Sequence, residues 1–371
     1  MPAPLATYDT RNTPDYLVVF CALFLVAFGV LMLASASSDL GNMRFGDSYY
    51  YVKHQMLYGL SIGILGFLFA ARQYYGAYRK IALPLLLVSV AGVALVFSPL
   101  GIRSGGAERW LSIGAIAFQP AELLKLALVI YLAAWLGNAP DRPQTVRRGL
   151  LPFVLVLGAI GAILLAQSTT STFVILAATA CIMYFASGAR IPYLVLTMIA
   201  GAAMMLLISY FTPYRWDRIT AYMNPEANVQ SSGYHLDQAR IAIGSGGLWG
   251  VGLGESTTKI RYLPEPIGDS IFAVIAEELG FVGAATVALL FGTLGVRTLL
   301  LARRVQNRFG ELLLVGFGSV IGIQAFIHIG AISGLTPLTG MPLPFISYGG
   351  TSLAVFMTMA GIIVNISKHT V

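Results

Sequence analysis

The sequence predicts an all-α protein that crosses a membrane about ten times and carries one large extracytoplasmic loop between the seventh and eighth helices. Of its 371 residues, 57% are apolar or aromatic and only 11% are charged, and the mean hydropathy is +0.77. A soluble domain carries about 25% charged residues, so this composition excludes one. Long uncharged runs, close to the roughly 20 residues that span a bilayer, recur along the chain, and no strand pattern competes with them.

Ten runs are predicted as membrane spans within a single domain over residues 1–371. The eighth is long enough to tilt or to extend beyond the bilayer. The residues before the first span, 1–15, are too acidic and the span too long for a signal peptide. The large loop covers residues 212–268. In order, the spans are Tyr16–Ser35, Gln55–Ala71, Ile81–Phe97, Gln119–Gly137, Leu150–Gln167, Thr170–Ser187, Ile191–Phe211, Asp269–Leu300, Glu311–Leu335 and Tyr348–Ser367.

Loop charges predict the orientation. With the N-terminus inside, the short inner loops carry basic clusters such as Arg79–Lys80 and Arg147–Arg148, whereas the short outer loops carry few. The positive-inside rule therefore places both termini in the cytoplasm. The net charge of +7 reflects this topology and does not indicate a nucleic-acid partner. Cys21 and Cys181 lie inside apolar runs, which predicts neither a disulfide nor a zinc site.

Charged groups inside a membrane cost several kcal/mol unless they pair or line a wet cavity, so each is a functional candidate. Gln119, Glu122 and Lys125 lie at i, i+3 and i+6 on one side of the fourth span. A purely structural ion pair between Glu122 and Lys125 stays open as an alternative.

The two spans after the large loop carry further polar residues. Asp269 directly precedes the eighth run, where the residues alone favour a helix-capping role. Glu277 and Glu278 point about 100° apart, so only one of them can face a given cavity. His328 is a single histidine on the ninth span, which predicts a packing residue and no histidine-based metal site.

The large loop combines glycines with cations. Its run 244–254 lacks the Gly-Lys-Ser/Thr end of a nucleotide loop, which favours close-packed backbone. Arg215, Arg218, Lys259 and Arg261 flank this run, and guanidinium groups match phosphate oxygens. Attraction to anionic lipid remains an alternative. The segment 340–352, rich in Gly and Pro, is expected to line a cavity or be buried in protein.

Several motifs, taken in order, resemble the SEDS family (shape, elongation, division and sporulation), which includes RodA and FtsW. The run Phe45–Gln55 resembles the division branch, FtsW, more than RodA. The matching motifs are Gly106-Ala-Glu-Arg-Trp110, Phe118-Gln-Pro-Ala-Glu-Leu-Leu-Lys125, Tyr234 with Gln238, Gly244-Ser-Gly-Gly247, Gly252-Leu-Gly254, Tyr262-Leu-Pro-Glu265, Ala276-Glu-Glu-Leu-Gly280 and Pro342-Leu-Pro-Phe-Ile-Ser-Tyr-Gly-Gly350.

This resemblance implies a peptidoglycan glycosyltransferase that polymerises lipid II into glycan strands at the outer face of the bacterial cytoplasmic membrane. It also implies a class B penicillin-binding protein, a transpeptidase, as partner, and an essential Asp269. Three departures stand out. Ile267-Gly268 replaces the usual approach to the aspartate, Gln167–Thr172 replaces a Gln-Pro-Asp string, and His328 stands where asparagine is usual.

Polymerisation needs a base for the attacking sugar hydroxyl and a clamp for the leaving diphosphate. We expect Asp269 to be the base, with Glu265 as the alternative. The sequence establishes no metal site, but Mg²⁺ or Mn²⁺ bound through Asp269 or Glu122 is left open. For the diphosphate, the candidates are Lys125, whose charge Glu122 adjusts, then Arg109, Arg215, Arg218, Lys259 and Arg261. The other substrate-binding candidates are Gln119, Gln238, Lys53 and Ser347.

Three alternative functions remain at this point. A lipid II flippase would use Arg109, Glu122 and Lys125 as a translocation path. An ion-coupled transporter would relay protons through Glu122, Lys125 and Glu277, although no pair of broken helices is evident in the sequence. An elongation-type polymerase would differ in its cellular role and not in its chemistry.

Overall fold

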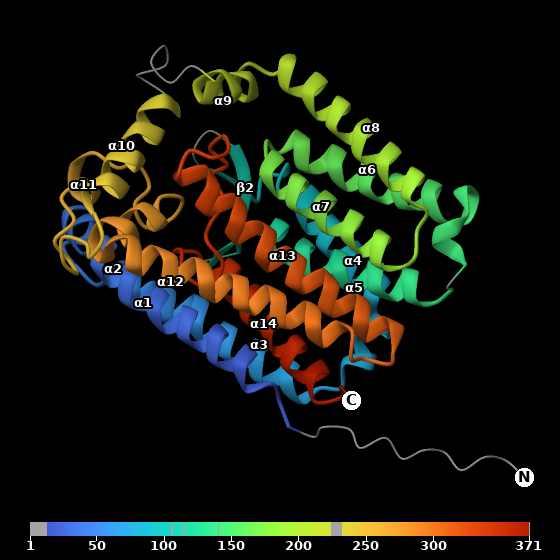
Figure 1. Cartoon of the computed structure of the whole chain (residues 1–371). Coiled ribbons are helices and arrows are strands. Elements are labelled where there is room, and N and C mark those ends of the chain that lie inside the picture. The colour runs from blue at the N-terminus through green and yellow to red at the C-terminus, as the bar shows by residue number, and fades with distance from the viewer. Residues whose placement is uncertain (1–12, 105–106, 114–115, 140, 224–231, 371) are drawn as a thin grey trace, which may run out of the picture.

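The apolar runs form helices because a helix satisfies its own backbone hydrogen bonds in lipid. The computed structural model describes residues 13–104, 107–113, 116–139, 141–223 and 232–370 (Figure 1). The helices are α1 (Tyr16–Phe45), α2 (Tyr50–His54), α3 (Ser61–Arg72), α4 (Tyr78–Leu95), α5 (Pro120–Gly137), α6 (Leu151–Ala166), α7 (Thr170–Ala186), α8 (Ile191–Tyr210), α9 (Pro213–Met223), α10 (Ser232–Ser245), α11 (Thr258–Arg261), α12 (Ile271–Ala302), α13 (Arg308–Ile332) and α14 (Gly350–Ser367). Short turns of π-helix (Gln55–Leu60, Val146–Leu150) and 3-10 helix (Tyr75–Ala77, Arg142–Gln144) complete them.

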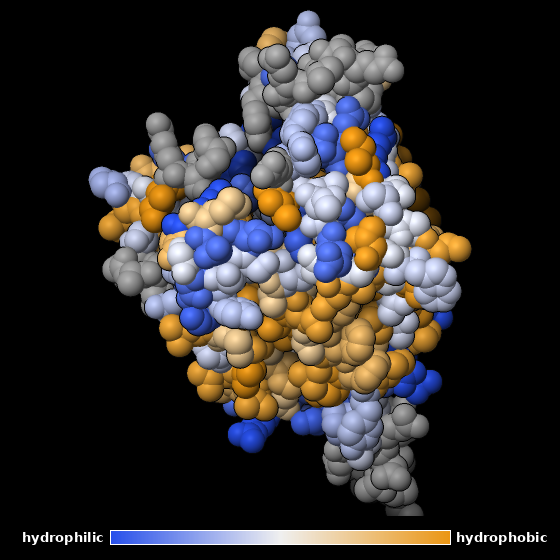
Figure 2. Space-filling model, turned by 90° about the vertical axis from the view of Figure 1, so that its left-hand side faces the viewer, coloured by the Kyte–Doolittle hydropathy of each residue, from blue (hydrophilic) through white to orange (hydrophobic). Residues whose placement is uncertain are grey.

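The predicted all-α membrane fold is confirmed. Within the described residues, nine helical segments are long and apolar enough to cross a bilayer, and α7 is a shorter apolar helix of 17 residues. The second span begins at Tyr50, earlier than predicted, because α2, a π-helical turn and α3 run on continuously. On the face that Figure 2 shows, apolar residues cover the body of the molecule and hydrophilic residues gather above them.

The segment between α4 and α5 contains short strands that the sequence did not predict. β1 (Gly101–Ser104), β2 (Ala107–Ile113) and β3 (Ile116–Phe118) form a three-stranded antiparallel sheet between α4 and α5. Strands of three to seven residues are too short to give a readable alternation of apolar and polar residues. The sheet matters because it carries Arg109.

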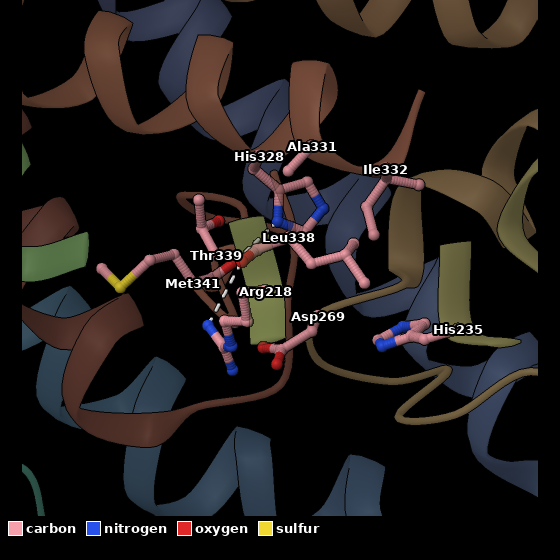
Figure 3. Close-up of a pocket in the computed structure, with 10 residues that line it drawn as sticks. Arg218, His235, Asp269, His328, Ala331, Ile332, Leu338, Thr339 and Met341 are labelled. Atoms are coloured by element: carbon pink, nitrogen blue, oxygen red, sulfur yellow. Dashed lines mark hydrogen bonds between the residues drawn. The ribbon is translucent and has the colours of Figure 1, made fainter. Parts of the chain in front are cut away.

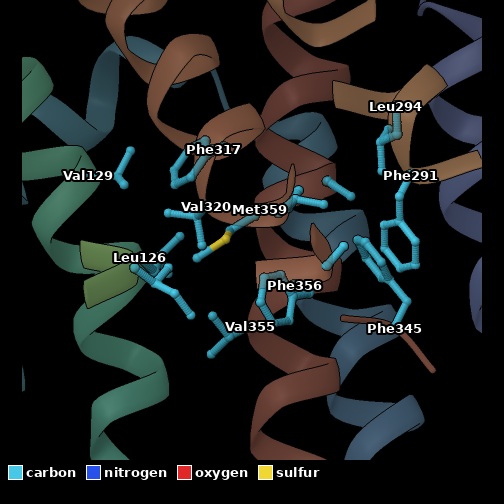
Figure 4. Close-up of a cluster of buried hydrophobic side chains, with 14 of the residues drawn as sticks. Leu126, Val129, Phe291, Leu294, Phe317, Val320, Phe345, Val355, Phe356 and Met359 are labelled. Atoms are coloured by element: carbon cyan, nitrogen blue, oxygen red, sulfur yellow. The ribbon is translucent and has the colours of Figure 1, made fainter. Parts of the chain in front are cut away.

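The centre of the bundle consists of α5, α13 and α14, whose side chains are the most completely buried. Figure 4 shows Leu126 of α5, Phe317 of α13 and Phe356 of α14 in one apolar cluster with residues of α12. By contrast, α8 exposes nearly its whole length, and it touches the rest of the chain mainly through α7 and α9. The most completely buried helices of the described chain therefore lie at the centre of the bundle.

The long helix α12 is broken at Gly280, which has φ 67° and ψ −166°. The glycine-rich loop enters this break. Gly247 and Leu248 carbonyls accept the Phe281 and Val282 N–H groups at 2.8 and 3.2 Å. A Cβ at Gly280 would overlap the loop backbone at Gly250. The loop is thus close-packed backbone, as the sequence favoured, and it takes up peptide groups that the broken helix leaves free.

The two ends of the bundle differ. At one end Asp15, before α1, pairs with Arg297 of α12 at 2.6 Å, and its N–H donates to Ser367 of α14 at 2.9 Å. The helices α9, α10 and α11 of the large loop lie at the opposite end (Figure 1). Whatever the orientation in a membrane, the termini and the large loop lie on opposite sides of the bundle.

Candidate functional site

A cavity of about 60 Å³ lies beneath the large loop, between α9, α10, α13 and the segment before α14. Figure 3 shows Arg218, His235, Asp269 and His328 around it. Ala331 and Ile332 of α13 and the segment 338–341 complete the wall. A cavity of this size has room for ordered water or for polar groups of a ligand.

Neighbouring side chains fix the backbone on both sides of Asp269. Ser347 donates its hydroxyl to the Gly268 carbonyl at 2.8 Å, and the Tyr348 N–H donates to the Ile267 carbonyl at 2.9 Å. On the other side, Ser270 donates its hydroxyl to the Pro264 carbonyl at 2.7 Å. The unusual Ile267-Gly268 approach is therefore firmly anchored, and Ser347 acts on Asp269 through the backbone.

Asp269 does not cap α12, so the role that the residues alone favoured is wrong. Ser270 occupies the capping position, and no side chain caps that end. Burial, reinforced by the Glu265 charge and offset by Arg218 and Arg109, raises the pKa of the Asp269 carboxyl from 3.8 to about 6. A carboxylate poised near neutral pH beside a cavity has the properties of a general base.

Arg218 is the cation brought nearest to this carboxylate. A Cβ added at Gly340 would lie 3.2 Å from the Asp269 Oδ2 and 3.6 Å from an Arg218 Nη atom. Both charged groups therefore converge on the bare backbone of Gly340, whose φ of +64° also favours glycine. Arg218 donates to the Leu338 carbonyl at 3.2 Å, which holds its guanidinium at the cavity wall.

Arg109 and Arg215 meet at the end of α6. Arg109 of β2 donates to the Ser168 carbonyl at 2.8 Å, and Arg215 of α9 donates to the Leu165 carbonyl at 2.5 Å. Cations at a helix C-terminus are favoured by the helix dipole. Each arginine keeps a buried Nε that has no partner in the described part of the chain. Two guanidinium groups, one from β2 and one from α9, therefore lie at the same helix end.

Glu122 and Lys125 form a buried pair, which is the arrangement that the structural alternative described. The Lys125 Nζ lies 2.7 Å from Glu122 Oε1 and 2.7 Å from Gln324 Oε1, and both charged side chains are at most 1% exposed. The Gln324 amide in turn donates to the Pro342 carbonyl at 2.8 Å. This cluster ties α5 to α13 and to the segment before α14.

Lys259 is likewise engaged in the protein interior. Its Nζ pairs with Glu278 at 2.6 Å and donates to Ser35 of α1 at 3.2 Å. Glu277 instead accepts hydrogen bonds from Ser256 and from the start of α11. The two adjacent glutamates thus face different partners, as their angular separation predicted.

The remaining predicted residues lie outside the cavity wall or beyond what is described. The Glu265 side chain is exposed, and Lys53 is 69% exposed in a pair with Asp47. Gln119 precedes α5, and its N–H donates to the Thr351 hydroxyl at 3.3 Å. Gln238 is half-buried on α10. The side chain of Arg261 lies outside the described residues.

Sequence reasoning missed two histidines. His235 of α10 contacts the Ser270 hydroxyl at 2.6 Å, and burial together with the Arg218 charge lowers its pKa to about 4. His328 was expected to be a satisfied packing residue, but its Nε2 is buried and has no partner in the described chain. No signal in the sequence pointed to His235. For His328, the signal was its position one turn after Gln324 on the same helical face.

No three His, Cys, Asp or Glu residues of the described chain stand together as a metal site would require.

Known proteins show which family the chain resembles. Residues 15–371 match the cell cycle protein family of FtsW, RodA and SpoVE. The chain is 35% identical over 361 residues to "Stage V sporulation protein E" of Bacillus subtilis, which covers 97% of this chain and 98% of that protein. It is 38% identical over 361 residues to "Probable peptidoglycan glycosyltransferase FtsW" of Geobacter sulfurreducens, covering 96% and 95%.

Two solved structures share the fold. One comes from work titled "Structural coordination of polymerization and crosslinking by a peptidoglycan synthase complex", with a TM-score of 0.79, 25% identity, and coverage of 95% of this chain and 97% of that one. The rod shape determining protein RodA of Thermus thermophilus gives a TM-score of 0.69 at 25% identity, with coverage of 95% and 96%.

Proposed function

Because this chain belongs to the FtsW, RodA and SpoVE family of cell cycle proteins, we propose that it polymerises lipid II into glycan strands at the outer face of the bacterial cytoplasmic membrane. It is a peptidoglycan glycosyltransferase and a multi-pass membrane protein. Both termini are proposed to lie in the cytoplasm, which puts the cavity and the large loop on the outer side. The charge of the short loops supports that orientation.

The observation that carries the mechanism is Asp269 at the cavity wall with a pKa raised to about 6. A sugar hydroxyl of one lipid II molecule attacks the anomeric carbon of another. Asp269 accepts the hydroxyl proton as the new C–O bond forms. The bond from that carbon to the diphosphate oxygen breaks, and polyprenyl diphosphate leaves. Glu265 is assigned a supporting role, because its charge raises the Asp269 pKa.

The diphosphate clamp is proposed to consist of Arg109, Arg215 and Arg218. These arginines come from β2 and α9, at the same end of the molecule as Asp269. Guanidinium groups stabilise charge that develops on phosphate oxygens. Lys125 and Lys259 fit this role less well, because their ammonium groups are buried and already paired.

Partners and metal ions are part of the same proposal. A class B penicillin-binding protein is the proposed partner, which fits the similarity to a chain from a complex that couples polymerisation to crosslinking. Mg²⁺ is commonly held by one or two carboxylates plus substrate phosphates, and Asp269 is the carboxylate in position to contribute. A division role is proposed because a relative carries the name FtsW and the run 45–55 resembles that branch.

Purified protein and labelled lipid II test the proposal. Wild type should form polymer, Asp269→Asn should form none, and Asp269→Glu should retain part of the activity. The reaction is run with and without a cognate transpeptidase and a chelator. Lipid II that crosses the bilayer of a vesicle without any polymer would instead identify a flippase.

A further inference from the structure

The cavity beside Asp269 contains a hydrogen-bond acceptor that the proposed mechanism does not use. His328 is 1% exposed, and its Nδ1 lies 2.6 Å from the Met341 carbonyl. A carbonyl oxygen can only accept, so Nδ1 carries the hydrogen of the neutral ring. Nε2 is then an acceptor with a free lone pair. It has no partner among the residues described, and His328 lines the cavity.

A buried acceptor without a partner destabilises the folded protein, and most buried polar groups have a hydrogen-bond partner. The rest of the cavity wall does not supply that partner. Ala331, Ile332 and Leu338 bring apolar side chains, and the donors that Arg218 and Thr339 bring to the wall make no hydrogen bond to Nε2. The Asp269 carboxylate, when ionised, can only accept. The cavity therefore presents Nε2 as an acceptor without a partner close to the Asp269 carboxylate, and a ligand with two donors could serve both groups.

We propose that His328 Nε2 accepts a hydrogen bond from a hydroxyl of the acceptor sugar next to the one that attacks. This inference rests on the proposed function. Neighbouring sugar hydroxyls supply two donors side by side, one for Asp269 and one for His328. The cavity of about 60 Å³ has room for such hydroxyl groups. His328 thus fixes which hydroxyl reaches Asp269.

Two substitutions separate this role from a structural one. His328→Gln and His328→Met have side chains of the same length, and both lose the bond from Nδ1 to the Met341 carbonyl. Only glutamine places an acceptor near the position of Nε2. If His328 merely holds Met341, the two variants lose activity equally. We expect His328→Met to lower kcat/KM for lipid II about 10-fold or more below His328→Gln, the size of one hydrogen bond to substrate.

Lipid II analogues provide a second measurement that needs no variant. In each analogue one hydroxyl adjacent to the attacking one is replaced by hydrogen. One analogue should lower kcat/KM of the wild type by a similar factor, and His328→Met should lose no further activity with that analogue. Equal rates for all analogues with the wild type, or equal rates of the two variants, overturn the inference and show that only water occupies Nε2. Failure of the wild type to polymerise lipid II itself would instead refute the proposed function.

Discussion

Replacing Asp269 with asparagine should abolish polymerisation and, at neutral pH, make the folded protein more stable. The carboxyl binds its proton more tightly in the folded protein, because its pKa is about 6 against 3.8 for the free side chain. A difference of this size corresponds to about 3 kcal/mol, at about 1.4 kcal/mol per pKa unit. Since Asp269 borders an open cavity and is only half-buried, we expect about 1 to 3 kcal/mol.

The sign follows from the raised pKa. The ionised carboxylate destabilises the folded state at pH above about 6, and this cost disappears as pH falls below the unfolded value of 3.8. Asparagine cannot ionise, so the gain in the free energy of unfolding from Asp269→Asn should reach its full size near pH 8 and about half of it near pH 5.

Thermal unfolding of the detergent-solubilised protein across this pH range measures the effect. Asp47→Asn is the matched control, because Asp47 is exposed and its pKa is lowered by Lys53. The control should give no stabilisation. A melting temperature of Asp269→Asn that is equal to or below that of the wild type near pH 8 would refute the electrostatic argument for Asp269.

Three further predictions concern the same molecule. The kcat/KM for lipid II should rise with pH, with a midpoint at about 6, as Asp269 loses its proton. Glu265→Gln should move this midpoint to lower pH, because a negative neighbour of Asp269 is removed. An unmoved midpoint would mean that a group other than Asp269 causes the pH dependence. Lys125→Met should destabilise the protein by about 3 to 5 kcal/mol, because it leaves a buried carboxylate unpaired, whereas Lys53→Met in an exposed pair should cost less than about 1 kcal/mol. Thermal unfolding compares the two variants, and similar losses of stability would contradict the assignment of Lys125 to a buried ion pair. Gly280→Ala should prevent stable folding, because a Cβ would overlap the glycine-rich loop. The loss of a monodisperse peak in size-exclusion chromatography would show this effect. Normal yield and stability would mean that the loop does not pack into the break of α12.

Particular residues show how far the sequence reached into the site. The uncharged runs predicted each membrane helix, and Asp269 and Arg218 were both predicted as functional residues and both line the cavity. The residues alone favoured helix capping for Asp269, but the helix begins one residue later than that prediction requires, and Ser270 occupies the cap position. Lys125 headed the list of diphosphate ligands, yet it is paired in the interior. Charge inside a span is readable from sequence, but its partner on another helix is not.

The sequence by itself determined that this protein is a bundle of membrane helices. That result depends on composition and run length, which are local properties, because a bilayer admits few structures. Only the tertiary structure decided which charges meet. Asp269, Arg218, His235 and His328 come from four separate parts of the chain, and their shared cavity exists because the segment before α14 folds back beneath the large loop. Contacts between residues so far apart in sequence arise from packing, which no local pattern specifies.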